Sequence, residues 1–275
     1  MNSPPEIAKV MCEVGVKKSQ MPIRNMFILG ILAGVYIGFG SQLMTVVTQD
    51  LSAHVGLGFA SFIGGSVFTV GLMLVVIGGA ELFTGNCLMV NACASKMTSW
   101  KGLLKNWTVV YLGNFVGSIL LAVIVFFGFY YGTDTTSTMG IRAIGIANIK
   151  VNLSFVTAIA RGIGCNWLVC LAVWLAASSK DISGKVWAIF FPIMAFVAIG
   201  FEHSVANMYF ISQGLLVGEL PAYASLATSN LTVSGFLFNN LLPVTIGNII
   251  GGAIFVGIFY WMAYIWTPKA PPSTP

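Results

Sequence analysis

The sequence predicts an all-α integral membrane protein with six transmembrane helices, two of which are broken. Three observations lead to this fold class. The mean hydropathy is +0.90 and only 8% of the 275 residues are charged, whereas soluble domains carry about 25%. The chain also has room for about six apolar runs of ~20 residues, the length that crosses a bilayer as a helix. Finally, the motif Gly-x-Glu-x-x-x-x-Asn interrupts two of those runs, at residues 79–86 and 200–207.

The apolar runs define the six expected spans. The second run is ended by Glu81 and the fifth stops at Glu202, so we expect both of these helices to be interrupted. The fifth run is too short to cross alone and is expected to resume after its break, through residues 207–216. The expected spans are residues 26–47, 59–80, 107–131, 155–177, 186–200 and 236–266.

The basic residues lie mostly on one side of these spans, and cytoplasmic loops are the side that carries such an excess. We therefore expect a multi-pass protein of the cell membrane with both termini in the cytoplasm. Its parts are a cytoplasmic N-terminal segment 1–25, a transmembrane domain 26–266 and a short Pro-rich cytoplasmic tail 267–275. The residues assigned to the cytoplasmic side are Lys9, Lys17, Lys18, Arg24, Lys96, Lys101, Lys105, Lys180, Lys185 and Lys269, against Arg142 and Lys150 on the other side.

A second pair of motifs indicates an internal repeat. LGNFVGS at residues 112–118 is answered by IGNIIGG at residues 246–252. The chain therefore divides into a first repeat, 26–131, and a second repeat, 151–266. Because each contains three spans, an odd number, the two must have opposite orientations, as in an inverted 3+3 repeat. Both motifs contain Gly-x-x-x-Gly, which suits close helix contact.

The two breaks predict a polar centre inside an apolar wall. In an inverted repeat the half-helices that follow the breaks begin near the bilayer midplane and point their N-termini at each other. Unpaired N–H groups there carry about half a positive charge per helix end, which favours an anion. Irregular backbone at this depth is tolerable only beside protein or water.

The carboxylates of the breaks, Glu81 and Glu202, are costly in a membrane and need partners. We expect each to accept hydrogen bonds from exposed N–H groups of the loop and, with Asn86 and Asn207, to hold the break in shape. A role as proton carrier or cation ligand is the alternative. The recurrence of Gly, Glu and Asn in both halves favours the structural role, because a symmetric role suits a scaffold.

His203 has no counterpart in the first repeat, where Leu82 takes its place. An imidazole can gain or lose a proton near physiological pH, and this one lies at the midplane beside the predicted anion site. We expect it to function in that site. Thr84, in the opposite break, is either a hydrogen-bond partner of His203 or an ordinary helix cap.

Other classes of protein fit the sequence less well. The basic residues are not clustered beside aromatic ones, so no nucleic-acid partner is expected. Two histidines provide neither a nucleophile–base pair nor a metal site, so neither an enzyme nor a cofactor or metal is expected. The five cysteines lie mostly in apolar segments, where a thiol behaves as a small hydrophobic side chain.

Three motifs resemble the formate–nitrite transporter family: GAELFTGN at 79–86, CNWLVC at 165–170 and FEHSVANM at 201–208. The resemblance covers almost the whole chain. It implies an aquaporin-like fold, a homopentamer with a pore in each protomer, and a small monovalent anion as the transported partner.

The resemblance also implies roles for single residues. Thr84 and His203 match the central pair of the family, and Asn166 and Lys150 match positions that help polarise the pore. The apolar constrictions match Phe68, Leu72, Leu82, Phe83 and Phe196, with Val169 as a further wall residue.

The resemblance implies transport of formate, the commonest substrate of such relatives. Proton coupling at His203 is expected because a neutral acid crosses an apolar constriction far more easily than its anion. Nitrite or hydrosulfide as substrate, or an anion channel without proton transfer, are the alternatives. A water or glycerol facilitator is disfavoured because its paired Asn-Pro-Ala motifs are absent, the two breaks reading TGN and VAN.

Overall fold

The computed structural model describes residues 1–266, and these residues form helices without any β-strand. Six helices are long and apolar enough to cross a membrane, which confirms the predicted class. They are Ile23–Val47, Leu57–Gly78, Trp100–Phe129, Phe155–Ser178, Ile182–Ile199 and Gly235–Tyr264. The predicted tail, 267–275, lies outside the described residues.

The elements are α1 (Pro4–Gln20), α2 (Ile23–Val47), α3 (Leu51–Val55), α4 (Leu57–Phe68), α5 (Val70–Gly78), α6 (Phe83–Asn86), η1 (Cys87–Met89), α7 (Val90–Ala94), α8 (Trp100–Phe129), α9 (Thr138–Val151), α10 (Phe155–Ser178), α11 (Ile182–Ile199), α12 (Ser204–Gly218), η2 (Ala224–Leu226), η3 (Gly235–Leu241), α13 (Leu242–Ile249), η4 (Ile250–Ile258) and α14 (Phe259–Tyr264). Of these, η3, α13, η4 and α14 form one continuous last span in which η3 and η4 are π-helical.

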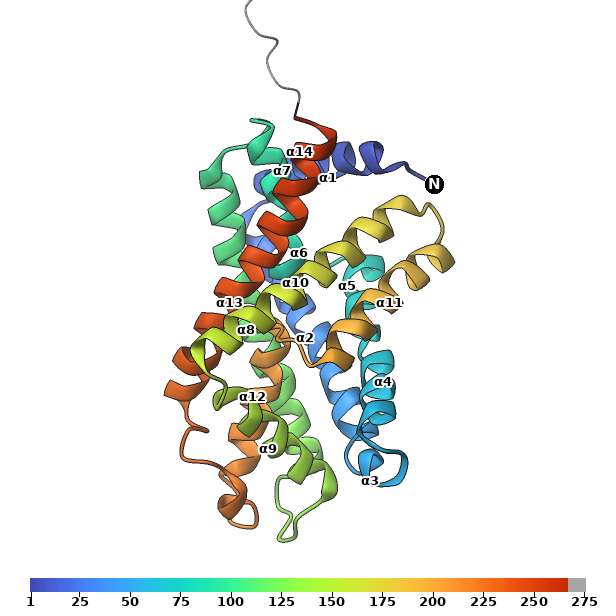
Figure 1. Ribbon diagram of the computed structural model, residues 1–275. Coiled ribbons are helices and arrows are strands. Elements are labelled where there is room, and N and C mark those ends of the chain that lie inside the picture. The colour runs from blue at the N-terminus through green and yellow to red at the C-terminus, as the bar shows by residue number, and fades with distance from the viewer. Residues whose placement is uncertain (267–275) are drawn as a thin grey trace, which may run out of the picture.

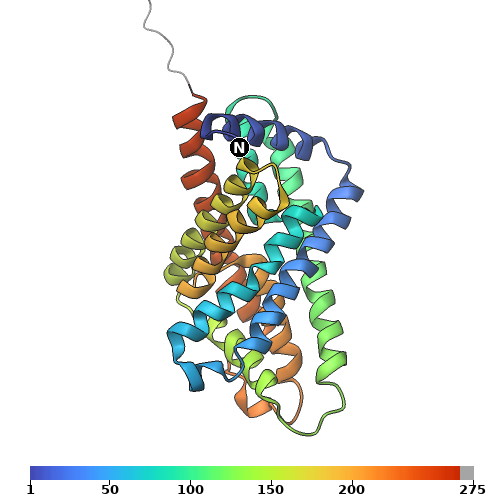
Figure 2. The same ribbon diagram turned by 90° about the vertical axis from the view of Figure 1, so that its right-hand side faces the viewer.

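The long helices form an elongated bundle in which the two interrupted helices run in opposite directions. In Figure 1, α4 and α5 rise from the lower end and are followed by α6, whereas α11 descends from the upper end and is followed by α12. The short helix α1 lies across the upper end, nearly at right angles to the spans (Figures 1 and 2). Helix α9 lies at the lower end.

Two helices, α1 and α9, lie in segments that the sequence analysis left between or before the spans. Each has a side-chain cap at its start: Ser3 and Glu6 form a capping box at α1, and the Ser137 hydroxyl accepts a hydrogen bond from Gly140 N at α9. Both are amphipathic rather than apolar throughout, so neither produces a run of hydropathy. Their buried faces pack onto the two ends of the bundle.

The repeated Gly-x-x-x-Gly motifs bring pairs of helices into backbone contact, as predicted. A Cβ atom on Gly117 of α8 would overlap the carbonyl oxygen of Ile31 in α2, and one on Gly251 would overlap that of Ile163 in α10. Only glycine fits at either position. Each pair joins the first and third spans of one half.

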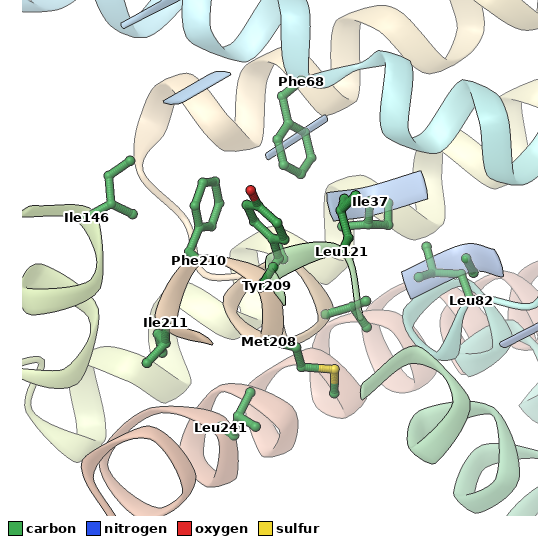
Figure 3. Packing of buried hydrophobic residues seen from close by; sticks show 14 of the residues in the cluster. Ile37, Phe68, Leu82, Leu121, Ile146, Met208, Tyr209, Phe210, Ile211 and Leu241 are labelled. Carbon is green, nitrogen blue, oxygen red and sulfur yellow. The ribbon is translucent and has the colours of Figure 1, made fainter. Parts of the chain in front are cut away.

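The buried core lies around α12, which is enclosed by α2, α8 and α9. Figure 3 shows Phe68 pointing from α4 toward α12, on which Tyr209 and Phe210 are buried, while Ile37 and Leu121 approach from α2 and α8. This packing buries the second half of the fifth predicted span on all sides. The helix breaks therefore sit inside protein rather than against lipid.

Candidate functional site

Each broken helix ends at the residue before the glycine of its motif. Helix α5 ends at Gly78 and α6 begins at Phe83, and α11 ends at Ile199 before α12 begins at Ser204. The glycines that open the breaks, Gly79 and Gly200, have φ of 85° and 84°. This left-handed conformation is a common end of a helix and strains any residue with a Cβ. It explains why both motifs start with glycine.

The carboxylate of the first break is buried and paired. Glu81 is 5% exposed. It forms an ion pair with Lys18 of α1 and accepts a hydrogen bond of 2.7 Å from the Asn86 side chain. The same Asn86 amide also donates to the side-chain oxygen of Asn106.

The second break repeats this arrangement. Glu202 is 3% exposed and accepts hydrogen bonds of 3.0 and 3.1 Å from Lys150 and of 2.6 Å from Asn207. Asn207 also donates to Asn240. The expectation that loop N–H groups hold the two carboxylates was therefore wrong, because a distant lysine and the asparagine of the same motif do so in each half.

The loop backbone is held instead by an asparagine of the third helix in each half. In the first half, Asn114 donates to the carbonyl oxygens of Gly30 (2.8 Å) and Glu81 (2.9 Å). Its own side-chain oxygen accepts from Phe83 N at 2.9 Å. One side chain thus satisfies both a carbonyl group of the gap and the first amide group of α6.

Asn248 makes the same three contacts in the second half. It donates to the carbonyl oxygens of Gly162 and Glu202 and accepts from Ser204 N at 2.9 Å. Asn114 and Asn248 were not among the predicted site residues. The signal was present, since both are the Asn of the repeated LGN and IGN motifs, but those motifs were interpreted through their glycines.

His203 and Thr84 meet where the two breaks approach each other. Both are buried, and the His203 Nε2 lies 2.8 Å from the Thr84 hydroxyl oxygen. His203 also caps α12, because its Nδ1 accepts a hydrogen bond of 3.1 Å from Ala206 N. In a neutral ring the proton is therefore on Nε2, which donates to Thr84. The predicted pair is brought together, and Thr84 is a partner of His203 rather than a helix cap.

Asn166 joins the two halves behind this pair. Its amide donates to the carbonyl oxygen of Thr84 at 3.1 Å and to that of Asn248 at 2.7 Å. It is fully buried. Asn166 therefore fixes the backbone of Thr84 relative to the second repeat.

Two cavities approach this centre from opposite ends of the bundle. The first, which we call the α1 cavity, has a volume of about 590 Å³ and is lined by Lys18, Leu72, Glu81 and Leu82 among others. The second, the α9 cavity, has a volume of about 190 Å³. Leu82 lies two residues before Thr84, and His203 itself lines the α9 cavity.

Aromatic rings line the α9 cavity beside His203. Phe68 and Phe196 are in edge-to-face contact with ring centroids 5.7 Å apart, and the Phe196 centroid lies 5.9 Å from that of the imidazole. Both phenylalanines line the α9 cavity, and both are buried. The apolar residues assigned to constrictions thus divide between the two cavities.

Phe83 and Val169 are exceptions, because neither lines the α1 cavity or the α9 cavity. The ring of Phe83 packs edge-to-face against Tyr111 and Trp107 of α8, with centroids 4.9 and 5.9 Å away. Val169 is 2% exposed and belongs to the hydrophobic core. Both side chains contribute to packing around the first break.

The fold and the site define a multi-pass membrane protein in which two helix breaks form a polar centre between two cavities.

Comparison with known proteins identifies the family. Residues 5–262 match the family described as Formate/nitrite transporter. The chain is 43% identical over 279 residues to the "Probable formate transporter" of Methanothermobacter thermautotrophicus, covering 96% of this chain and 97% of that one. It is 38% identical over 270 residues to the "Formate channel FocA" of Escherichia coli strain K12, covering 95% and 94%.

Solved structures agree with the sequence comparison. A "Pentameric formate channel with formate bound" superposes with a TM-score of 0.81 at 39% identity, covering 89% of this chain and 98% of that chain. An "FNT family ion channel" has a TM-score of 0.82 at 29% identity, covering 95% and 99%. The chain belongs to the formate/nitrite transporter family.

Proposed function

We propose that this protein transports a small monovalent anion, formate first, across the cell membrane through a pore in each protomer of a homopentamer. The observation that carries the proposal is the buried His203–Thr84 pair between two cavities. The names of the relatives, and the formate-bound pentamer among the solved structures, support both the substrate and the assembly. Nitrite and hydrosulfide are the alternative substrates.

The proposed path runs from the α1 cavity past Leu72 and Leu82 to the central pair, and then past Phe68 and Phe196 into the α9 cavity. Its walls on either side of the centre are apolar, and apolar side chains do not replace the water of an ion. A formate anion that takes up a proton at the centre leaves as a small neutral acid. This favours proton-coupled transport over a plain anion channel.

The hydrogen bonds of His203 bear on where the proton comes from. A neutral His203 already uses Nδ1 to cap α12, so a second proton on Nδ1 must displace the bond from Ala206 N. We propose that the neutral imidazole and Thr84 orient the anion, that the proton comes from bulk water on the side of entry and returns to water on the other side, and that protonation of His203 itself is the costlier route. Lys150 and Asn166 complete the centre: Lys150 neutralises Glu202, and Asn166 holds Thr84.

Uptake of labelled formate into proteoliposomes under an imposed pH gradient tests the proposal. The His203→Phe protein should lose pH-driven uptake. His54→Phe provides a matched control, because His54 is the other histidine and is exposed at the end of α3. If His203→Phe leaves the pH dependence of uptake unchanged, the histidine has no part in proton coupling. Nitrite and hydrosulfide in the same assay decide between substrates, and a voltage-driven current without proton movement would favour the plain channel.

The proposed topology places both termini in the cytoplasm, with the α1 cavity facing inward and the α9 cavity outward. It retains the division into segment 1–25, transmembrane domain 26–266 and tail 267–275. Labelling of single cysteines introduced at exposed positions of α1 and of the loop after α8, in intact cells, tests the orientation. Only the second position should react with an impermeant reagent.

A further inference from the structure

The residues that brace the two breaks occur in matched pairs, one from each half. The pairs include Lys18 with Lys150 and Glu81 with Glu202. A residue that makes the same contact in both halves has a structural role in the scaffold. A charged residue whose equivalent position in the other half holds an apolar residue does not have this shared structural role, so its charge needs another explanation.

Backbone hydrogen bonds at the two breaks show which residues occupy equivalent positions in the two halves. Glu81 N donates to the carbonyl oxygen of Leu29, and Glu202 N donates to that of Arg161, so Arg161 occupies the place of Leu29. Each of these residues lines the cavity on its own side. The second half thus has a guanidinium where the first half has an aliphatic side chain.

Arg142 is a second arginine that lies where the first half has an aliphatic residue. The carbonyl oxygens of Lys18 and Lys150 accept hydrogen bonds from Asn106 and Asn240, which makes α1 and α9 equivalent helices. Eight residues before each lysine, α1 has Val10 and α9 has Arg142. Each again lines the cavity on its own side, Val10 the α1 cavity and Arg142 the α9 cavity.

The α9 cavity therefore holds three cations, Arg142, Lys150 and Arg161, against the single carboxylate of Glu202. Lys150 is paired with that carboxylate. Arg142 uses only its Nε, which donates to the Thr48 hydroxyl at 3.2 Å. Within residues 1–266, the Arg161 guanidinium donates no hydrogen bond and has no carboxylate within 4.0 Å. Two guanidinium groups thus face a cavity of about 190 Å³ with donors to spare.

We infer that Arg161 and Arg142 form an anion-capture subsite in the α9 cavity, selective for planar monovalent anions with two equivalent oxygens. A guanidinium presents two parallel N–H donors that match the two oxygens of a carboxylate, whereas a single-atom anion can use only one direction. The subsite holds formate before it passes Phe68 and Phe196. This inference deepens the proposed function and rests on it.

Two substitutions of Arg161 test the subsite. Arg161→Leu places in the α9 cavity the same side chain that Leu29 has at the equivalent position of the first half. Arg161→Lys keeps the positive charge but removes the two parallel N–H donors of the guanidinium. The backbone carbonyl that supports Glu202 is unaffected by either. Arg24→Leu is the matched control, because Arg24 is exposed and lines neither cavity. Labelled formate uptake and release are measured in intact cells, so that each cavity is presented with formate separately.

Arg161→Leu is expected to raise the half-saturating formate concentration on the α9 side by about two- to fivefold, the range of one half-exposed charge interaction. The value on the α1 side and the maximal rate should not change, and the increase should shrink at high salt. Arg161→Lys should recover only part of the loss for formate but all of it for hydrosulfide. An unchanged value on the α9 side, or full recovery of formate by lysine, overturns the inference.

Binding separates a failure of the subsite from a failure of the proposed function. Formate should raise the melting temperature of the purified unmodified protein, and Arg161→Leu should reduce that shift. If the shift is seen but no formate is transported, the proposed function fails and the subsite stands. If transport is seen without any effect of Arg161→Leu on either measurement, the subsite fails and the function stands.

Discussion

Replacement of Asn248 by alanine is the sharpest test of how the breaks are held. Alanine removes the side chain that bonds to Gly162, Glu202 and Ser204. Gly162 lies inside α10, where its carbonyl oxygen also has a place in the helix ladder. The carbonyl oxygen of Glu202, in the gap, and the amide group of Ser204, at the start of α12, are left unpaired.

The magnitude follows from those two groups. A buried polar backbone group that loses its partner costs about 1–3 kcal/mol, so the free energy of unfolding should fall by about 2–6 kcal/mol. A change of 1 kcal/mol shifts the melting temperature of a chain of this size by about 2–4 °C. Asn248→Ala should therefore lower the melting temperature by at least about 4 °C. It should also reduce formate uptake, because Ser204 follows His203 directly.

Thermal unfolding in detergent, followed by tryptophan fluorescence, provides the measurement. Asn239→Ala is the control, since Asn239 lies in the same last span but is exposed and makes no side-chain hydrogen bond within residues 1–266. Asn114→Ala should behave like Asn248→Ala, because it leaves the matching groups of the first break unpaired. If Asn248→Ala melts at the temperature of the control, the asparagine does not hold the break.

Three further predictions concern the ion pairs, the close helix contacts and the start of α1. Lys150→Met should destabilise the protein by about 3–5 kcal/mol because it leaves a buried carboxylate without a cation, and Glu202→Gln in the same chain should restore most of the melting temperature. Gly117→Val should lower the melting temperature strongly, since a Cβ meets backbone of α2, whereas Gly128→Val on the same helix meets nothing within 4 Å and should be neutral. Two hydrogen bonds from Ser3, the larger effect coming from its backbone N–H and the smaller from its hydroxyl, lower the pKa of Glu6. The Glu6 carboxylate therefore stabilises α1 fully above its ordinary pKa of 4.5. This stabilisation is lost as the pH falls through the lowered pKa. Hydrogen exchange of the first turn of α1, corrected for intrinsic rates, should show this loss, and Glu6→Gln should abolish it.

These three predictions fail in distinct ways. A Lys150→Met protein that gains nothing from Glu202→Gln would show that the lysine acts elsewhere than on this carboxylate. Equal melting temperatures for Gly117→Val and Gly128→Val would show that α2 and α8 can separate without cost. A pH response that persists in Glu6→Gln would assign it to another group.

Local properties of the chain predicted much of the fold. The six spans follow from apolar runs, which any sufficiently long buried or lipid-facing helix must have. The bounds shift where charged side chains lie at a membrane edge. Helix α8 begins at Trp100, before the predicted residue 107, because Lys101 and Lys105 are exposed there and depress the hydropathy without ending the helix.

The partners of the buried carboxylates could not be predicted in this way. Glu81 is paired with a lysine 63 residues earlier, and Glu202 with one 52 residues earlier. Those lysines lie on α1 and α9, short amphipathic helices without a hydropathy signal. The central pair was predictable because His203 interrupts the repeat and Thr84 lies in the opposite break. The pairing of distant polar groups depends on how the helices pack, which no local pattern records.

The bracing of the first break uses residues that are all synthesised early. Lys18, Glu81, Asn86 and Asn114 lie within the first 114 residues of the chain, and the contacts among them need nothing from the later half. During translation the first three spans can therefore lock their gap while the ribosome is still producing the rest. The bond between Thr84 and His203 forms only after the fifth span has been inserted. A half-made chain thus has its first break braced but lacks the Thr84–His203 centre.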